Sequence, residues 1–193
     1  DVCSSDLHII SANMHSVMNS LYAKKALFNT KIDFKEYEGY EILSKVENQN
    51  LRNKVEKYAL QNGMTYIKDS SGTNIDVQLF DKVVNNNKIE DQPVILVMDY
   101  AFGEQAYETI DELLKPVIKQ GVKTYINVKS VSIMGKAGIL EGGKGDIMIP
   151  SAHIFEGTAD NYPFKNELKK HHFQGSGIDV YEGSMVTVLG TSL

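Results

Sequence analysis

The segment SVSIMGKAGILEGGKGDIMIP, residues 130–150, holds the clearest chemical signal in the sequence. An apolar run breaks at two glycines that flank Lys136, and a second apolar run follows a further glycine-rich turn. Glycine adopts backbone conformations that turn successive N–H groups toward one point, which creates a binding site for an anion. The segment predicts that Gly135, Lys136, Ala137 and Gly138 bind a phosphate or a carboxylate. An ordinary glycine-rich hairpin is the alternative.

Two strand-to-helix turns also contain residues that can reach a ligand. His15 follows the first predicted strand, where it either contacts a substrate or bonds within its own helix, and the second interpretation is favoured. Gly103 lies at the turn after another predicted strand, and the backbone N–H groups of such a turn bind ligands. Asp99 ends that strand and can face the same cleft. Of these three residues, Gly103 is taken as a candidate site residue.

The remaining polar candidates are assigned structural roles. Asp146 is predicted to cap a tight turn that it forms with Lys144 and Gly145. His171 and His172 are adjacent, so their rings point in different directions on either a helix or a strand. No metal site is therefore predicted.

Strand and helix patterns alternate along the first two-thirds of the chain. An apolar run at residues 7–13 precedes an amphipathic helix with Asn13 as its N-cap, and a buried strand at residues 93–100 precedes a helix whose apolar face extends to Val117. The polar residues 70–92 predict a loop, a short helix and a second loop. The last third consists of consecutive strands. These patterns predict an α/β fold with a mixed, curved central sheet flanked by helices, which binds ligands at the carboxyl ends of its strands.

The amino-acid composition limits the kinds of molecule that the protein can bind and the chemistry that it can use. The net charge of −5 argues against a nucleic-acid partner. No apolar run reaches the length of a membrane span, and no signal-peptide pattern is present, so a cytoplasmic protein is predicted. Cys3 is the only cysteine, which excludes disulfides, cysteine–zinc sites and a cysteine nucleophile in the remainder of the chain.

Both ends of the chain are predicted to be incomplete. Residues 1–7, DVCSSDL, are what a common sequencing adapter spells when it is translated, and they are interpreted as an artefact. The last residues stop within an apolar strand pattern. Residues 8–193 are therefore predicted to form one partial domain of a longer protein, with no linker that would divide it.

The motif SIMGKAGILEGGKGDIMIP resembles the nucleoside phosphorylase superfamily, and its AMP nucleosidase branch most closely. In that branch the loop reads Gly-Lys-Cys-Gly-Gly-Leu, followed by Gly-Asp-Leu-Ile-Leu-Pro and then by Arg-Gly-Glu-Gly-Thr-Ser-Asn-Asp-Tyr. This chain has GKAGIL, GDIMIP and FEGTADNY in the same order, and GSMVTVLGTS resembles the later Gly-Thr-Val-Tyr-Thr-Thr segment. The match covers residues 130–193, and the earlier units agree in architecture only. The chain also looks like part of a longer, uncharacterised bacterial family.

The resemblance implies a three-layer α/β/α fold, truncated at its C-terminal end, and cleavage of the N-glycosidic bond of a purine nucleoside or nucleotide. The transition state would be oxocarbenium-like, and water or phosphate would attack. No organic cofactor is implied, although phosphate is a possible co-substrate. The Lys136 loop would line the phosphate side. Together with Gly103, the nucleoside-binding residues would be Glu156, Gly157, Thr158, Asp160, Asn161, Thr187, Thr191 and Ser192.

Several family features are absent from the matched part of the chain. Phosphorolysis usually employs arginines around the phosphate, but Arg52 is the only arginine and lies on a helix that looks structural. A hydroxyl residue commonly occupies the position of Lys136. Both departures favour hydrolysis over phosphorolysis. The catalytic aspartate and the Met-Glu pair that binds ribose are expected beyond Leu193, in what is commonly a homo-oligomer.

A catalytically inactive nucleotide-binding or regulatory module on the same fold is the alternative to an enzyme. A third interpretation, a flavodoxin-like or sugar-nucleotide domain, is disfavoured by the run of strands after Gly138.

Overall fold

The computed structural model describes residues 6–34, 37–70, 74–81, 93–99, 103–138, 140–158 and 160–187. The chain divides into two compact units, unit 1 (Asp1–Gly135) and unit 2 (Lys136–Leu193), and each is considered by itself. Both helices and sheets are present, so the fold class is mixed α/β, as predicted. The boundary between the units falls in the short glycine-containing segment that follows a strand. This segment is too short to be recognised in the sequence as a linker.

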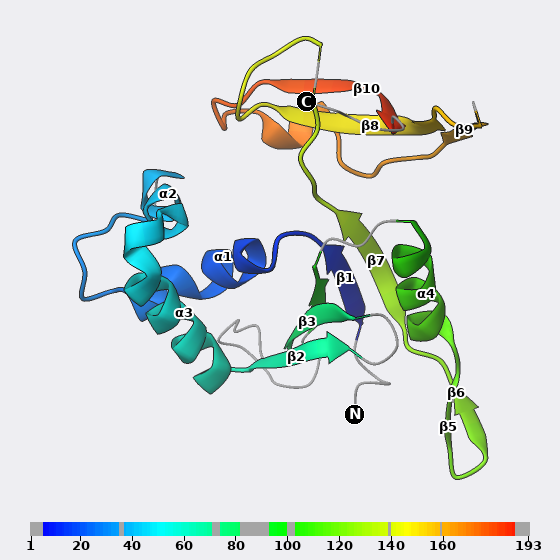
Figure 1. Ribbon diagram of the computed structural model, residues 1–193, viewed down its shortest axis with the longest axis horizontal. Coiled ribbons are helices and arrows are strands. Elements are labelled where there is room, and N and C mark those ends of the chain that lie inside the picture. The colour runs from blue at the N-terminus through cyan, green and yellow to red at the C-terminus, as the bar shows by residue number, and fades with distance from the viewer. Residues whose placement is uncertain are drawn as a thin grey trace. The chain divides into compact units, whose positions relative to one another are not determined.

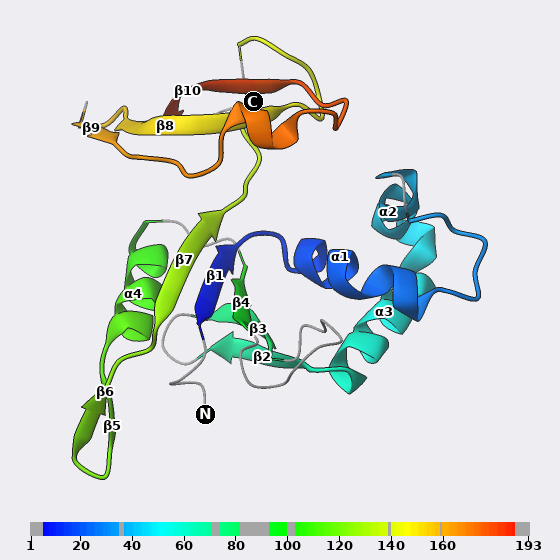
Figure 2. The ribbon, with the colours of Figure 1, turned by 180° about the vertical axis from the view of Figure 1, so that it is seen from behind.

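A five-stranded sheet with the order β2-β3-β4-β1-β7 forms the centre of unit 1 (Figure 2). Its strands are β1 (Leu7–Ser11), β2 (Met64–Ser70), β3 (Ile75–Phe80), β4 (Val94–Met98) and β7 (Val128–Ile133). Strand β1 pairs in parallel with β4 and β7, whereas β3 is antiparallel to β2 and β4. The reversal of β3 pairs its Val77 with Met98 near the end of β4. The first half of β3 therefore lies at the same edge of the sheet as the carboxyl ends of β1 and β4.

Helices cover both faces of this sheet (Figure 1). The helices of unit 1 are α1 (Met14–Ala26), α2 (Tyr37–Ser44), the 3-10 helix η1 (Val46–Asn48), α3 (Gln49–Gln61) and α4 (Gly103–Leu114). Ile110 and Leu113 of α4 pack against Ile9 of β1 and other buried residues of one face. The opposite face packs against α1 and α3. A short hairpin of β5 (Val117–Lys119) and β6 (Val122–Thr124) follows α4.

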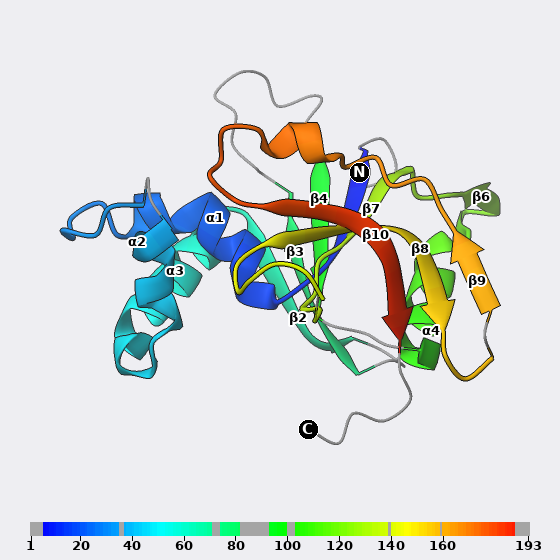
Figure 3. The same cartoon turned by 90° about the horizontal axis from the view of Figure 1, so that it is seen from above.

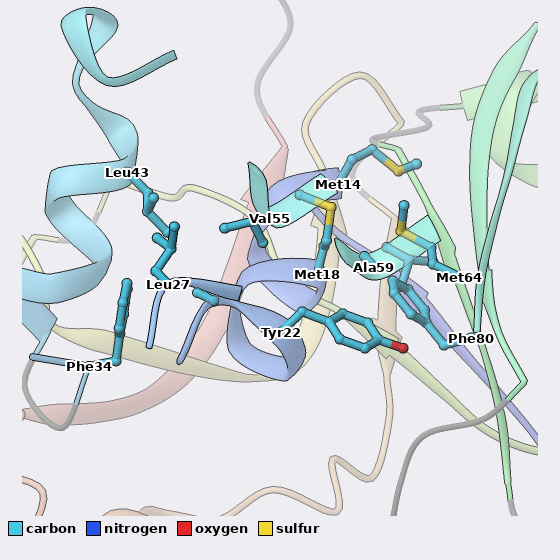
Figure 4. Packing of buried hydrophobic residues seen from close by; sticks show 12 residues of the cluster. Met14, Met18, Tyr22, Leu27, Phe34, Leu43, Val55, Ala59, Met64 and Phe80 are labelled. Atoms are coloured by element: carbon cyan, nitrogen blue, oxygen red, sulfur yellow. The ribbon is translucent and has the colours of Figure 1, made fainter. Parts of the chain in front are cut away.

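The core between the sheet and helices α1 and α3 contains the largest buried side chains of unit 1. Phe80 of β3 has no exposed surface, and its ring stacks on that of Tyr22 of α1, with 6.0 Å between the ring centroids (Figure 4). Val55 and Ala59 of α3 are also fully buried in this cluster. The remaining buried members are Met14, Met18, Ala23, Leu27, Phe34, Leu43, Met64 and Val97. Burial of apolar surface against the sheet therefore holds the two helices in place.

Two sequence predictions for unit 1, the N-cap role of Asn13 and the structural role of Arg52, are confirmed in detail. Asn13 caps α1, because its side-chain oxygen accepts a hydrogen bond from the backbone N–H of His15 at 3.0 Å. Gly63 follows the C-cap of α3 with a φ of 101°, which favours glycine. Arg52 is structural: its guanidinium donates to the carbonyl oxygens of Leu43 and Lys45.

Two predictions for unit 1 are wrong. The stretch expected to form a loop and a short helix contains strand β3 instead. Ile75 and Val77 alternate with Asp76, which is the side-chain period of a strand, and the strand pairs with β4. Helix α4 ends at Leu114, so Val117 is not on its apolar face. Pro116 accounts for this end, since proline cannot continue a helix.

Unit 2 is a three-stranded sheet with the order β10-β8-β9 (Figure 3). Its strands are β8 (Ile147–Phe155), β9 (Asp160–Pro163) and β10 (Val180–Thr187), and the 3-10 helix η3 (Lys170–Phe173) lies between the last two. Strand β8 is parallel to β10 and antiparallel to β9. The consecutive strands that the sequence predicted are confirmed. They form a separate sheet and do not extend the central one, contrary to the prediction of a single mixed sheet.

Candidate functional site

A hollow of about 210 Å³ opens at the edge of the unit 1 sheet where β1 and β4 end. Its lining combines acidic, amide, aromatic and thioether side chains from α1, α3, β2, β3 and the end of β4. The lining residues are Asn13, Met14, His15, Met18, Glu56, Tyr66, Asp76, Gln78 and Asp99. Ligands of open α/β sheets bind at this edge, so the hollow is the candidate functional site of unit 1.

The turn between β1 and α1 forms one wall of the hollow. The backbone N–H of Ala12 donates to the carbonyl oxygen of Met98 at 3.1 Å, which ties the end of β1 to the end of β4. The Asn13 cap then starts α1, and His15 in the first turn lines the hollow. The sequence favoured a structural role for His15, but its position permits contact with a ligand.

Strand β3 contributes a polar face to the hollow. Its side chains alternate, so Ile75 and Val77 enter the core next to α4 while Asp76 and Gln78 line the hollow. The Tyr66 hydroxyl of β2 donates to Asp76 Oδ2, and the backbone N–H of Asp69 donates to Asp76 Oδ1 at 3.0 Å. Two donors from the neighbouring strand therefore fix the orientation of the Asp76 carboxylate.

The same hydrogen bonds shift the ionisation of both partners. The hydrogen bond from Tyr66, followed by that from the Asp69 backbone, lowers the pKa of Asp76. The hydrogen bond to Asp76, with a smaller contribution from burial, raises the pKa of Tyr66 from 10.0 to about 12. At neutral pH Asp76 is therefore ionised and Tyr66 keeps its proton.

Replacing Tyr66 with phenylalanine is expected to raise the pKa of Asp76 toward its ordinary value of 3.8, because its strongest donor is lost. In the unaltered protein this pair contributes stability above the unfolded pKa of the carboxyl, and the contribution disappears as the pH falls through the lower, folded pKa. For Tyr66 the contribution is present below pH 10.0 and disappears as the pH rises through about 12.

An NMR titration of the Asp76 side-chain carboxyl carbon measures this effect directly. Tyr107→Phe is the matched control, because Tyr107 is an exposed tyrosine on α4 that does not line the hollow. An Asp76 pKa that is the same in Tyr66→Phe and in the control would show that the hydrogen bond does not form in solution.

Gln78 presents a buried oxygen without a partner. Its side chain is only 4 % exposed, and its Oε1 has no hydrogen-bond partner among the described residues. A buried acceptor that loses its bonds to water without gaining others costs free energy. Among the residues that line the hollow, Gln78 is the one that holds such an atom.

The charge of the hollow is negative. Glu56, Asp76 and Asp99 each contribute a carboxyl group, and neither lysine nor arginine is among the described residues that line it. This charge favours a ligand that donates hydrogen bonds and opposes an uncompensated phosphate. Within the described parts of the chain, no three or more His, Cys, Asp or Glu residues are grouped so that they could hold a metal ion.

The segment that the sequence predicted as an anion site lies on the surface. Gly135, Lys136, Ala137 and Gly138 are all exposed and lie outside regular secondary structure. Neither Gly135 nor Gly138 has a positive φ, so the segment lacks the left-handed glycine found in one form of anion-binding nest. Anion binding by these residues remains a prediction.

The residues predicted to contact a nucleoside meet in part at one end of the unit 2 sheet. Thr187 of β10 is in register with Phe155 of β8, which is in register with Asp160 of β9. This row brings the backbone of Thr187 to the turn formed by Glu156, Gly157 and Thr158, and Asn161 follows Asp160. The side chains of Glu156, Thr158, Asp160 and Asn161 are exposed.

The other predicted residues are distributed differently. Gly103 is the first residue of α4 in unit 1, and Thr191 and Ser192 lie outside the described residues. Asp146 has the structural role that was predicted, because its Oδ2 accepts a hydrogen bond from the backbone N–H of Gly143 at 2.6 Å.

Six residues of the hollow were not predicted from the sequence: the core methionines Met14 and Met18, and Glu56, Tyr66, Asp76 and Gln78. The signal for two of them was the alternation of polar and apolar residues in IDVQLF, which is the period of a strand with one polar face. Tyr66 belongs to β2 and Glu56 to α3, and nothing in the sequence shows that these elements meet β3.

Comparison with known proteins identifies one family. A family model described as "Family of unknown function (DUF6909)" matches residues 34–193. No curated protein and no solved structure matches the chain. None of the helices that the structure describes has the length and apolar character to cross a membrane.

Proposed function

Because the chain belongs to the DUF6909 family, whose function is unknown, we propose from its own residues that it cleaves the N-glycosidic bond of a purine nucleoside or nucleotide. The reaction would follow the pattern of AMP nucleosidase, which the motifs around Lys136 and Glu156 resemble. A homo-oligomer remains a prediction from the same resemblance.

The acidic hollow of unit 1 is the observation that most supports this proposal. It lies at the ligand-binding edge of the sheet and offers the carboxylate oxygens of Asp76 and Asp99. Ribose hydroxyls and the amino groups of a purine are donors that such oxygens bind. Carboxylates beside the sugar also stabilise the positive charge that develops there as the glycosidic bond breaks.

Attack by water is favoured over attack by phosphate. The guanidinium of Arg52, the only arginine, is hydrogen-bonded to the carbonyl oxygens of Leu43 and Lys45 and to the side chain of Gln49. Lys136 is exposed and is the cation of the GKAGIL segment. A lysine supplies a point charge without the two parallel hydrogen bonds that arginine gives to phosphate.

A binding module without catalysis is the second candidate function. The backbone at Gly135 and Gly138 favours it, because neither glycine has the positive φ that one form of phosphate-binding nest uses. Such a module would still bind a purine derivative at the unit 1 hollow.

The test uses the full-length protein with adenosine, inosine and AMP, each with and without phosphate, and follows the released base by chromatography. We expect base release that does not require phosphate. Asp76→Asn is expected to reduce the rate at least about tenfold, the scale on which the loss of one charge-stabilising group acts. Glu108→Gln removes the same charge from the exposed surface of α4 and is expected to leave the rate unchanged.

The outcomes separate the two candidates. Binding of a nucleoside without release of base contradicts the enzyme and supports the module. Neither binding nor release contradicts both. Release that strictly requires phosphate contradicts the preference for water.

A further inference from the structure

We propose that the outward face of α4 and the β5–β6 hairpin form a surface on unit 1 that binds a second copy of this chain. The hairpin of each copy would lie along α4 of the other, so that a two-fold axis relates the pair. No residue of α4 or of the hairpin is among the described residues that line the hollow, so the surface is separate from the candidate site. The inference holds whether or not a glycosidic bond is cleaved, and it assigns residues to an association for which the family resemblance supplied none.

The β5–β6 hairpin extends away from the central sheet of unit 1 (Figure 1, Figure 2). Its large apolar side chains are exposed, and they are Val117, Ile118, Val122 and Tyr125. Val117 and Ile118 are adjacent in β5, so they point to opposite faces and both faces of the hairpin present apolar surface. A two-stranded hairpin alone is only marginally stable in water. A partner that covers these side chains would therefore stabilise the hairpin.

The outward face of α4 presents further apolar surface. Ile110 and Leu113 turn toward the sheet, whereas Tyr107 and Leu114 are exposed. Tyr107 and Leu114 are seven residues apart, which is about two turns of a helix, so they lie on the same face. Exposed tyrosines are enriched at interfaces between proteins, because the ring supplies a large apolar area while the hydroxyl keeps a polar contact.

The charges of the helix and the hairpin are opposite in sign. Residues 103–112 contain four acidic side chains and no basic one, whereas residues 113–135 contain four lysines and no acidic side chain. Lys115, at the end of α4, forms ion pairs with Asp111 and Glu112 of the same helix. The charges beyond this junction are therefore segregated, with the negative ones on α4 and the positive ones on the hairpin.

Four of these charges identify the partner. Among the exposed residues that form no ion pair with another described residue are Glu104 and Glu108 on α4 and Lys119 and Lys123 on the hairpin. A two-fold contact that brings each hairpin to the other copy's helix places both lysines beside both glutamates, and it does so twice. The surface is therefore complementary to itself, which favours a second copy over an unrelated protein.

The arrangement of the two elements allows both contacts at once. The hairpin follows α4 in the chain and lies beyond the C-terminal end of the helix (Figure 1). A two-fold axis near Lys115 reverses the second copy, so each hairpin runs beside the other helix. Tyr107 and Tyr125 are 72 % and 63 % exposed. A fully covered aromatic side chain buries about 150–250 Å², so these two supply roughly a quarter to two-fifths of the about 800 Å² per partner in a stable interface.

Sedimentation-velocity ultracentrifugation of the full chain, over a wide range of protein concentration, tests the proposal. We expect a reversible dimer whose affinity falls as the salt concentration rises, because salt screens the exposed charges. Ile118→Asp places a charge in the apolar part of the surface and is expected to weaken the dimer at least about tenfold. A chain that remains a monomer at every concentration overturns the proposal.

Charge reversal tests which elements meet. Lys119→Glu combined with Lys123→Glu, and separately Glu104→Lys combined with Glu108→Lys, place like charges opposite one another. Each double variant is expected to dimerise at least about tenfold more weakly than the unaltered protein. An equimolar mixture of the two is expected to restore the dimer, because every hairpin then meets a helix of opposite charge.

Lys24→Glu combined with Lys25→Glu is the matched control, since these are two exposed lysines in the last turn of α1. It is expected to dimerise like the unaltered protein. Dimers that Ile118→Asp leaves unchanged would show that another surface is used. Reversed variants that do not associate when mixed would contradict the contact between the hairpin and α4. Circular dichroism of each variant confirms that it is folded before its association is interpreted.

Discussion

Replacing Phe80 with alanine is expected to lower the free energy of unfolding of unit 1 by about 3–5 kcal/mol. The ring has no exposed surface and stacks on Tyr22, and Phe80 belongs to the cluster between the sheet and helices α1 and α3. Its removal takes away buried apolar area and leaves a cavity that the surrounding strands cannot close, since β3 is held between β2 and β4.

Urea denaturation followed by circular dichroism measures this loss. Phe28→Ala is the control, because the side chain of Phe28 is 76 % exposed and its removal leaves no cavity. That variant is expected to change the free energy of unfolding by less than about 0.5 kcal/mol. Equal losses in the two variants would contradict the placement of Phe80 in the core.

The second large effect is expected at Gly39, in helix α2. Alanine normally stabilises a helix relative to glycine by about 1 kcal/mol. At this position a Cβ atom would lie 2.0 Å from the backbone oxygen of Asp33, which a side-chain rotation cannot relieve. The chain before α2 must shift, so Gly39→Ala is expected to destabilise unit 1 by about 1–3 kcal/mol, the usual range for overpacking.

Gly183→Ala in strand β10 is the matched control for this prediction. A Cβ atom there would meet the terminal methyl group of Met148 at 3.0 Å, and that methyl group lies at the end of a flexible side chain. The control is expected to be nearly neutral in the same urea titration. A stabilised Gly39→Ala protein would show that α2 does not pack against the Asp33 backbone.

The elements that the sequence predicted well are those with a strong local pattern. Strands β1 and β4 are short β-branched or apolar runs, and α1 has both an apolar face and a capping residue. Strand β3 was missed because it lies in a polar stretch of sequence and pairs with β2 and β4, which are distant from its own local pattern. Recognising β3 as a strand requires knowledge of its long-range pairing, which no short stretch of sequence reveals.

The candidate site was predicted less well than the elements. Glycine permits a positive φ but does not require one, so the composition around Lys136 could not determine whether its amides converge. The position of Asp99 at the end of a strand was recognised. Tyr66 and Gln78 enter the hollow only because β2 and β3 form a hairpin whose register brings them to the same edge.

The inner wall of the hollow includes the thioether side chains of Met14 and Met18, which are 8 % and 2 % exposed and belong also to the core cluster (Figure 4). An unbranched side chain with three rotatable bonds reshapes its surface at low cost. The hollow can therefore be tolerant of the length and branching of a ligand's hydrocarbon part. Recognition would then depend on where the ligand places its polar end, and homologous ligands of different chain length would differ little in affinity.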